Sequence, residues 1–342
     1  MTIPAMIASL ADRESPPMVI LDITNVCNLQ CIHCPQPSIQ SAPNFMATHM
    51  TRNVFGAVLD DLKRVKEPSL LRFVGDGEPL LHPDAVAMLI RARTETSCVI
   101  NVTTNGTRLT KEVGRKLLDA GVHMIDVSID ALTKPTYERV RKTGRFELVL
   151  ANLFTLLEVR RQVRSDTKVL VSFIPQAENE AEESAFRAFW EPLVDFVSIR
   201  ALHSANNRVK VDESVARSAM MSTTRFPCAH LWKRLVVDFA GRIKFCPTDW
   251  GTGSVIGHAL QGGLEAAWAK VGELRRQHLH GAIPVASICG PCTDWATTPW
   301  DRGYERIVDA LVFRRDALCP GLPLLDLTGL NQAPLSSPGG AS

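Results

Sequence analysis

Residues 18–34 indicate both the fold and the chemistry of this chain, and they read MVILDITNVCNLQCIHC. Their first part, Met18–Ile23, is a run of branched apolar residues that is typical of a strand covered on both faces. Cys27, Cys31 and Cys34 follow it directly, so their thiols are predicted to lie in the loop after the strand. In β/α barrels, the loops at the carboxyl ends of the strands form the active site. The stretch therefore predicts a strand that leads into a three-thiol site.

Further strands of the same kind are expected as far as about residue 200. Short runs dense in Val, Ile or Leu alternate with longer segments of helical periodicity, the pattern of consecutive β/α units around a parallel sheet. With the first strand, six runs can be counted, which predicts an α/β fold. The other five are Leu70–Val74, Val99–Thr103, Met124–Ile129, Lys168–Phe173 and Phe196–Arg200.

Helices are predicted in the gaps between these strands. The segment from Thr51 carries one apolar stripe, and Thr51 suits the N-cap position. Another helix is expected to begin near Thr110 and to end at Gly121, because glycine tolerates the left-handed conformation after a helix. The remaining helices are expected at Pro83–Arg93, Glu147–Val163 and Glu180–Trp190.

Composition restricts the possible partners and the compartment. The 342 residues include 38 basic and 36 acidic side chains spread along the chain, so no broad positive field favours nucleic acid or acidic lipid. Apolar stretches fall short of the roughly 18 residues that span a bilayer, and the N-terminus lacks a secretion signal pattern. Nine cysteines, seven of them clustered at metal-ligand spacing, do not resemble a disulfide framework. We therefore expect a cytoplasmic protein in a reducing compartment, with no nucleic acid or membrane partner.

The pattern changes after residue 205. Leu235–Phe239 and Ile243–Phe245, separated by Ala240-Gly241, predict a β-hairpin. A helix is expected at Leu264–Arg276 and another around Tyr304–Arg315, before a Pro-, Gly- and Ser-rich mobile tail. The predicted organisation is an N-terminal extension (1–17), a β/α domain (18–205), a small hairpin and helix domain (206–300), and a C-terminal helix with a flexible tail (301–342).

The first cysteine group has two possible occupants. Three thiolates can hold three irons of a [4Fe–4S] cluster and leave the fourth iron open to another ligand. The alternative is a structural zinc ion bound by the three cysteines and His33, for which adjacent His33 and Cys34 would have to reach one metal at awkward geometry.

The spacing C-x₃-C-x₂-C after a strand, in a chain of six β/α units, resembles the radical S-adenosylmethionine (SAM) superfamily. The resemblance implies a partial (β/α)6 TIM-like barrel and SAM bound at the open iron. It also implies that an electron from an external donor of flavodoxin or ferredoxin type splits SAM into a 5′-deoxyadenosyl radical. That radical then takes a hydrogen atom from the substrate. His33 stands where the family often has an aromatic residue.

Two further motifs resemble the family's SAM-binding segments. Gly77, Glu78 and Pro79 follow the second strand, where a carboxylate can accept hydrogen bonds from the SAM ammonium group. Thr104 and Asn105 follow the third strand, where they resemble ribose or methionyl contacts. A strand-to-helix turn and a helix cap are the ordinary alternatives for such residues.

Three polar residues after the third strand also match family positions that contact SAM. Ser128 and Asp130 close the fourth strand, and alternation along that strand would point Ser128 inward. Arg141 matches a basic residue that can pair with the SAM carboxylate, although a solvated face is the usual explanation for such a charged run.

A second cysteine group follows around the predicted hairpin. Cys228 precedes the hairpin, Cys246 ends it, and Cys289 and Cys292 form a later C-x₂-C pair. The group resembles the C-terminal module called SPASM or its shortened form, twitch, which implies a second, fully ligated [4Fe–4S] cluster. A zinc ribbon would use the same four cysteines equally well. Of the other two cysteines, Cys98 is expected to be a buried small apolar residue, and Cys319 is either idle or a hydrogen-atom donor.

A second cluster could act as an electron acceptor, which indicates an oxidation among the possible reactions. Loss of a proton and an electron after hydrogen abstraction from a carbon bearing OH would give a ketone. Return of a hydrogen atom by a thiol would instead give an epimer. A catalytic base or substrate contact is conceivable at His82, Arg200 or Asp249, although His82 can begin a helix and Asp249 can orient the hairpin.

The sequence therefore predicts a radical SAM oxidoreductase or epimerase. Only seventeen residues precede the first strand, whereas peptide-modifying relatives commonly carry an N-terminal recognition domain. We therefore expect a small polar substrate, sugar-like or an aminocyclitol, in natural-product biosynthesis. A peptide-modifying maturase and a zinc-stapled binding protein without catalysis are the alternatives.

Overall fold

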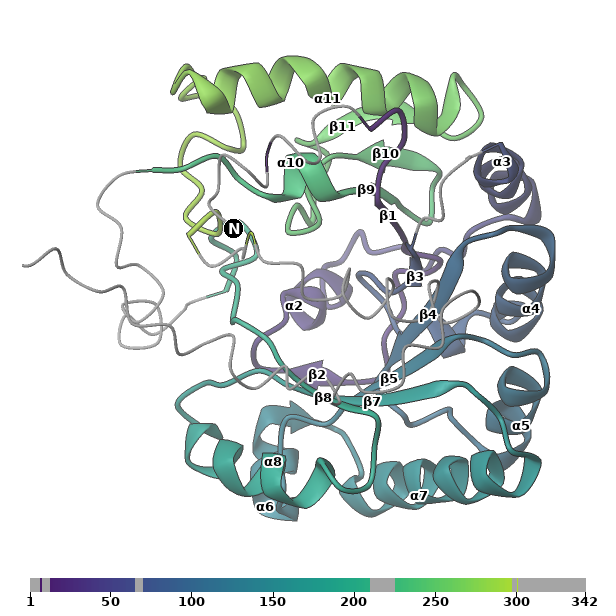
Figure 1. Ribbon diagram of the computed structural model, residues 1–342. Coiled ribbons are helices and arrows are strands. Elements are labelled where there is room, and N and C mark those ends of the chain that lie inside the picture. The colour runs from purple at the N-terminus through teal and green to yellow at the C-terminus, as the bar shows by residue number, and fades with distance from the viewer. Residues whose placement is uncertain (1–6, 8–12, 65–69, 210–224, 297–299, 301–342) are drawn as a thin grey trace, which may run out of the picture. The chain divides into compact units, whose positions relative to one another are not determined.

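The computed structural model describes residues 7, 13–64, 70–209, 225–296 and 300 of the chain (Figure 1). These described residues belong to one compact unit. The predicted helix at Tyr304–Arg315, the tail and Cys319 lie outside the described residues.

Six parallel strands form the centre of the sheet, in the order β1-β3-β4-β5-β7-β8, and confirm the predicted α/β fold. Each lies within two residues of its predicted range. Their bounds are β1 (Met18–Leu21), β3 (Leu70–Phe73), β4 (Val99–Thr104), β5 (Met124–Ser128), β7 (Lys168–Phe173) and β8 (Phe196–Ile199).

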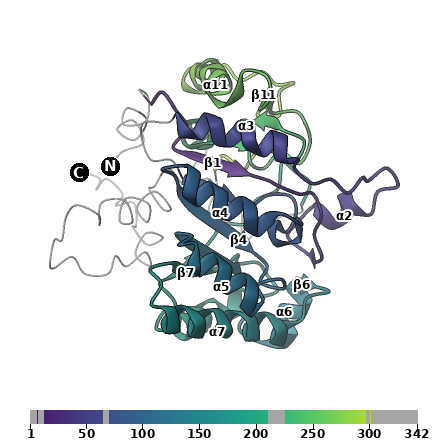
Figure 2. The same ribbon diagram turned by 90° about the vertical axis from the view of Figure 1, so that its right-hand side faces the viewer.

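The helices between the strands lie along one side of the sheet, as the row formed by α3, α4, α5 and α7 shows (Figure 2). Their bounds are α3 (Arg52–Lys63), α4 (Ala85–Glu95), α5 (Lys111–Asp119), α6 (Lys134–Val140), α7 (Phe146–Val163) and α8 (Glu183–Trp190), with the 3-10 turn η2 (Glu180–Glu182) before α8.

The predicted caps are present. The Thr51 and Thr110 side chains accept hydrogen bonds from the N–H groups of Val54 and Val113, each at 3.3 Å. Gly121 follows α5 with a φ of +67°.

The two faces of the sheet differ in polarity. Val19, Leu21 and Ile23 belong to the apolar core, as do Leu71 and Phe73 on β3. Because side chains alternate along a strand, Ile20, Asp22 and Arg72 point to the opposite, concave face. On β4 and β5 the same alternation sends Asn101, Thr103, Asp126 and Ser128 to that face. The barrel therefore has an apolar outer layer and a polar interior.

Three more strands extend the sheet beyond β1. β9 (Arg234–Val237) pairs with β1 in parallel, and β10 (Arg242–Lys244) pairs with β9 in antiparallel fashion, which confirms the predicted hairpin. β11 (Val255–His258), which was not predicted, completes a nine-stranded sheet. Since β9 continues the barrel sheet, a separate domain over residues 206–300 stays a prediction.

Helix α11 (Gly263–Leu279) packs along this extension (Figure 1). The Leu264 N–H donates to Asp61 of α3 at 2.8 Å, and the Trp268 indole donates to the Arg13 carbonyl at 2.9 Å.

Several short elements were not predicted from the sequence. They are β2 (Gln30–Cys31), α2 (Gln36–Gln40), η1 (Pro79–Leu81), β6 (Arg141–Lys142) and α10 (His230–Lys233). Elements of two to five residues are too short to show a periodicity of 2 or 3.6. Most of them lie beside the predicted site residues. The structure therefore shows parts of the site that sequence periodicity could not predict.

No helix among the described residues combines the length and apolar character needed to cross a bilayer.

Candidate active site

The loop that carries the first three cysteines is fixed at both ends. Gln40 of α2 accepts a hydrogen bond from the Cys27 N–H at 3.1 Å and donates one to the Cys27 carbonyl at 3.0 Å. At the other end, β2 pairs with β6, so that Cys31 lies opposite Arg141. Helix α2 and the β2-β6 ribbon thus hold the three thiols in one short segment at the carboxyl end of β1.

The three thiols are suited to binding a metal cluster. All three are partly exposed, and burial raises the thiol pKa of each, to about 11 for Cys31 and about 12 for Cys34. An Arg141 Nη1 lies 3.9 Å from the Cys31 sulfur, where its positive charge favours the thiolate. Thiolates are the ligands of iron–sulfur clusters, and metal binding to such thiols releases their protons. Across the described residues, no three Cys, His, Asp or Glu side chains converge on one point as ligands of a single ion.

Glu78 joins the loops that follow β3 and β4. Its carboxylate accepts from the Thr104 hydroxyl at 2.6 Å, the Asn105 N–H at 2.7 Å and the Leu80 N–H at 3.1 Å. Only 3% of Glu78 is exposed, and burial raises the pKa of its carboxyl group. The predicted SAM-binding residues Glu78, Thr104 and Asn105 therefore form one hydrogen-bonded unit, while their direct contact with SAM stays a prediction.

This unit is also tied to the cysteine loop. Asn28, between Cys27 and Cys31, accepts from the Asn105 amide at 3.0 Å and donates to Thr107 at 2.9 Å. The Glu78 N–H donates to the Val26 carbonyl at 2.9 Å. Three sequence-distant motifs thus meet at the carboxyl ends of β1, β3 and β4.

Two glycines permit this close approach. A Cβ atom at Gly77 would lie 2.3 Å from the Thr24 carbonyl oxygen, and one at Gly75 would lie 2.2 Å from the Asp22 carboxyl carbon. No side chain fits at such distances, so the backbone after β3 packs directly on the loop before Cys27. Pro79 is buried at the start of η1, directly behind this contact.

Asp130 and Arg141 form a buried ion pair beside the first cysteine group. The Arg141 Nε atom lies 2.9 Å from Asp130 Oδ2; Arg141 is 5% exposed and Asp130 is 1% exposed. Asp130 also accepts from the Ile174 N–H, and His33 Nε2 lies 3.6 Å from it. Arg141 therefore has a carboxylate partner within the chain, next to Cys31. Whether it also pairs with the SAM carboxylate stays a prediction.

The concave face of the barrel carries a second charged network. Arg72 donates to Asn101 and to Thr103, each at 3.0 Å, and Arg200 forms an ion pair with Asp126. Arg200, predicted as a substrate contact, is thus on the concave face and partly exposed, with Asp126 as its partner. Ser128 is also on this face, 3.3 Å from the Ser172 hydroxyl.

A group of acids that sequence reasoning missed lies between this face and the hairpin. Asp22 is 2% exposed, and its Oδ2 atom has no hydrogen-bond partner among the described residues. Burial raises the pKa of Asp22 well above its ordinary value, and the neighbouring Asp76 carboxylate raises it further. Burial likewise raises the pKa of Asp76 to about 6, whereas Lys244 of β10 lowers it. In the sequence, this group of acids was indicated only by the position of Asp22 at the end of a strand.

The two other predicted catalytic residues have structural partners. His82 is 5% exposed; one ring nitrogen contacts the Met50 carbonyl at 3.0 Å and the other accepts from the Asp84 N–H at 2.9 Å. Asp249 accepts from the N–H groups of Gly251 and Ser254 at 2.9 and 2.7 Å. These contacts favour the structural alternatives, with His82 leading into α4 and Asp249 shaping the turn after β10.

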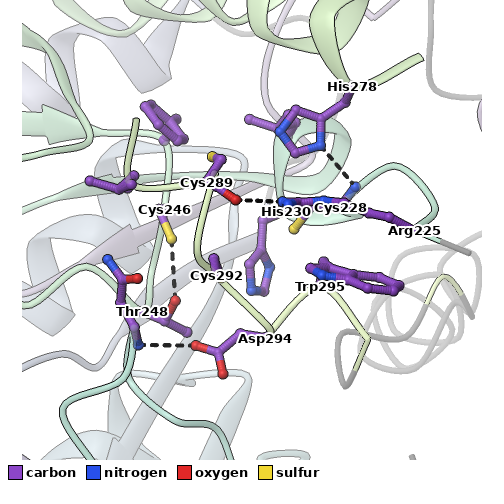
Figure 3. A pocket seen from close by; sticks show the side chains of 14 residues that line it. Arg225, Cys228, His230, Cys246, Thr248, His278, Cys289, Cys292, Asp294 and Trp295 are labelled. Carbon is purple, nitrogen blue, oxygen red and sulfur yellow. Dashed lines mark hydrogen bonds between the residues drawn. The ribbon is translucent and has the colours of Figure 1, made fainter. Parts of the chain in front are cut away.

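The second cysteine group lines one cavity, part of which is open to solvent. Cys228, Cys246, Cys289 and Cys292 come from three separate segments and surround this space (Figure 3). Burial raises the thiol pKa of each, to about 12 for Cys246 and about 11 for Cys289. By their chemistry alone, four thiols are the donor set of a fully ligated cluster and also that of a zinc ion.

Polar contacts fix the segments that carry these cysteines. Arg225 donates to the carbonyls of Cys289 and Gly290 at 2.7 and 3.2 Å. The Thr248 hydroxyl lies 3.3 Å from the Cys246 sulfur. His278 of α11, which sequence reasoning also missed, accepts from the Cys228 N–H at 3.3 Å. The later C-x₂-C loop and the helix are therefore both anchored at the cavity wall.

Comparison with known proteins identifies similar chains. The family model described as Radical SAM superfamily matches residues 21–188. The AdoMet-dependent heme synthase of Methanosarcina barkeri is 34% identical over 148 residues, which are 43% of this chain and 41% of that protein. The chain spans half or less of the length of the first curated relatives that it matches.

Two solved structures have the same fold. BtrN in complex with AdoMet and 2-DOIA has a TM-score of 0.56 at 15% identity, over 83% of this chain and 96% of that one. SuiB of Streptococcus suis bound to the precursor peptide SuiA has a TM-score of 0.57 at 14% identity, over 78% of this chain and 67% of that one.

Proposed function

This chain belongs to the radical SAM superfamily, and from that membership we propose that it oxidises a small polar metabolite, sugar-like or an aminocyclitol, in natural-product biosynthesis. Enzymes of the family use SAM and a [4Fe–4S] cluster. A cytoplasmic setting and an electron donor of flavodoxin or ferredoxin type are part of the proposal.

Cys27, Cys31 and Cys34 would hold the cluster that binds SAM, and Cys228, Cys246, Cys289 and Cys292 would hold a second [4Fe–4S] cluster. When bound, these groups supply a 5′-deoxyadenosyl radical and an acceptor for one electron. The unit of Glu78, Thr104 and Asn105 would shape the SAM site from the side of β3 and β4, with Gly77 and Pro79 bringing the backbone close. Arg141, paired with Asp130, places positive charge beside Cys31, and Ser128 would approach SAM from β5.

The polar concave face between the two cysteine groups is the observation that carries the choice of substrate. Arg200 and Ser128 are accessible there, and Asp22, Asp76 and Lys244 lie toward the hairpin. Such a surface offers donors and acceptors to hydroxyl and amino groups, and it offers little to an apolar ligand. BtrN, whose structure was solved in complex with AdoMet and 2-DOIA, shares the fold, and this similarity supports the choice.

Asp76 is the best-placed proton acceptor for an oxidation. Its pKa of about 6 is near the range in which a carboxylate serves as a general base at neutral pH. It lies near Lys244 and Asp249 on one side and influences the pKa of Cys34 on the other. We therefore place the transfer of the substrate hydroxyl proton at the Asp76 carboxylate, with Lys244 balancing its charge.

Among the described residues, no thiol outside the two cysteine groups is placed to support epimerisation. An epimerase needs a thiol that returns a hydrogen atom to the substrate. Of the eight cysteines described, only Cys98 stands outside the two groups, and it is 1% exposed beside the amino end of β4. That end of the sheet is opposite the site, so Cys98 cannot reach a substrate there.

The test is anaerobic incubation of iron- and sulfide-loaded protein with SAM, dithionite and a panel of aminocyclitols and amino sugars. We expect 5′-deoxyadenosine together with a product that has lost two hydrogen atoms. A product that keeps the substrate mass in H₂O and carries one solvent deuterium when the reaction is run in D₂O would indicate epimerisation instead. Turnover of peptides alone would support the maturase alternative, and a colourless zinc protein that lacks labile sulfide would end the proposal.

A further inference from the structure

His278 is a buried residue in the wall of the second cysteine cavity. It is located near the end of α11, is 6% exposed, and lines the same space as Cys228, Cys246, Cys289 and Cys292. Figure 3 shows its ring beside Cys228. The family match, over residues 21–188, does not include His278, and His278 is not part of the cysteine motifs, so neither gives it a role.

The contact with Cys228 determines which ring nitrogen carries the proton. The Cys228 N–H donates to His278 Nδ1 at 3.3 Å, so Nδ1 is an acceptor and carries no hydrogen. In neutral imidazole the proton must then be on Nε2. A doubly protonated ring would have no acceptor for the Cys228 N–H, and burial disfavours that charged form.

The Nε2–H donor has no protein partner. Among the described residues, no hydrogen-bond acceptor lies within reach of this atom, although it is buried. A buried donor without a partner destabilises the fold, so such donors normally face a ligand or an ordered water. Two other polar groups of the cavity wall have protein partners: the Thr248 hydroxyl contacts the Cys246 sulfur, and the Arg225 Nη2 donates to the Cys289 carbonyl.

We propose that His278 is a positioning residue for the second iron–sulfur cluster, and that its Nε2–H donates a hydrogen bond to a sulfur atom of that cluster. This inference rests on the proposed function, because it requires a cluster at the four cysteines. A hydrogen bond to sulfur stabilises the extra negative charge of the reduced cluster and raises its reduction potential. His278 would thus tune how readily the second site accepts the substrate electron.

The experiment measures the second cluster alone, in full-length protein whose Cys27, Cys31 and Cys34 are replaced by Ala. Potentiometric titration followed by EPR gives its midpoint potential. His278→Phe should shift the reduction equilibrium about tenfold toward the oxidised cluster, which is about 59 mV for a one-electron couple. His278→Gln keeps an N–H donor at a similar reach, so its midpoint potential should stay close to that of the wild-type protein. His280→Phe, an exposed change two residues away, should leave the potential unchanged.

A second measurement does not depend on the His278→Phe variant folding. Pulsed EPR of the reduced cluster with wild-type His278 should detect an exchangeable proton coupled to the cluster, which disappears in D₂O. Absence of that proton, or an unchanged potential in His278→Phe, would overturn the inference. A strong imidazole nitrogen coupling, with loss of iron in His278→Gln, would overturn it in favour of direct ligation. Failure of the protein to bind iron and sulfide at this site would instead remove the second cluster of the proposed function.

Discussion

Several charged side chains beside the cysteine loop are buried next to other charged side chains. Single substitutions of these residues should therefore change the stability of the protein. The Asp76 carboxylate raises the pKa of the buried Asp22, and Asp130 pairs with Arg141 next to Cys31. Neither arrangement is visible as a sequence motif. Both lie at the carboxyl ends of the strands, where stability is commonly lowered in favour of function.

Asp76→Asn should stabilise the protein at neutral pH. The folded-state pKa of Asp76, about 6, is above the ordinary value of about 4, so its contribution to stability is complete below pH 4 and is lost as the pH rises through 6. Because the side chain is partly exposed, we expect a gain of about 1 kcal/mol at pH 8 and none at pH 4. Urea unfolding at both pH values measures it. Asp166→Asn, in an exposed loop, is the control, and an equal gain at both pH values would contradict the prediction.

Arg141→Met should destabilise the fold strongly. It leaves the Asp130 carboxylate buried without its cationic partner, which costs about 3–5 kcal/mol in other buried pairs. Asp130→Asn in the same background should recover part of the loss, since asparagine tolerates the positive φ of 60° at this position. Thermal unfolding of these variants is the measurement. Arg145→Met, an exposed change nearby, should have almost no effect, and a similar loss there would refute the explanation.

At the scale of elements, short pieces of structure connect the long ones into a site. Helix α2 holds Cys27, the β2-β6 ribbon places Arg141 opposite Cys31, and η1 begins at Pro79 behind the cysteine loop. The β2-β6 pairing and the hydrogen bond between Asn28 and Asn105 join segments that are more than fifty residues apart. These contacts therefore form only once the sheet has brought the strand ends together.

Gly77→Ala should disturb the loop before Cys27. The new methyl group would lie 2.3 Å from the Thr24 carbonyl oxygen, so the backbone has to move, at a cost of about 1–3 kcal/mol. We expect lower iron and sulfide content per chain after reconstitution, together with lower stability. Gly56→Ala, in α3 with open space around it, should be neutral or stabilising. Full cluster content in Gly77→Ala would show that this contact does not position the cysteines.

At the scale of the whole molecule, a single sheet connects the two cysteine groups. β9 pairs with β1, so the hairpin that leads to Cys246 is in register with the strand that leads to Cys27. The concave polar face and the acids Asp22 and Asp76 lie between the groups. The arrangement predicts that the two groups have separable roles.

Replacing Cys289 and Cys292 by Ala should separate those roles. We expect the variant to keep the first cluster and to split SAM within about threefold of the wild-type rate, because the first group does not contact this loop. Oxidised product should fall at least about a hundredfold, since the electron acceptor is lost. Parallel assays of 5′-deoxyadenosine and of product measure the two effects. Retained product formation would mean that the second group is only structural, as a zinc site would be.

The order of elements was predictable because it depends on local patterns. Strands such as Lys168–Phe173 and caps such as Thr51 and Thr110 follow from apolar runs and side-chain chemistry within a few residues. The seven clustered cysteines likewise indicated the two segments for which metal binding is predicted. Contacts to SAM or to the substrate were harder to predict from the sequence, because Glu78, His82 and Asp249 each have several partners within the chain.

By itself, the sequence determined which segments become strands, which loops carry thiols, and the family to which the chain belongs, since each depends on neighbouring residues. Only the tertiary structure decided that Arg141 pairs with Asp130, that Asp22 meets Asp76, and that His278 faces the four-cysteine cavity. Those pairs join segments far apart in the chain. Their energies arise from burial and from distances that exist only after the sheet has formed.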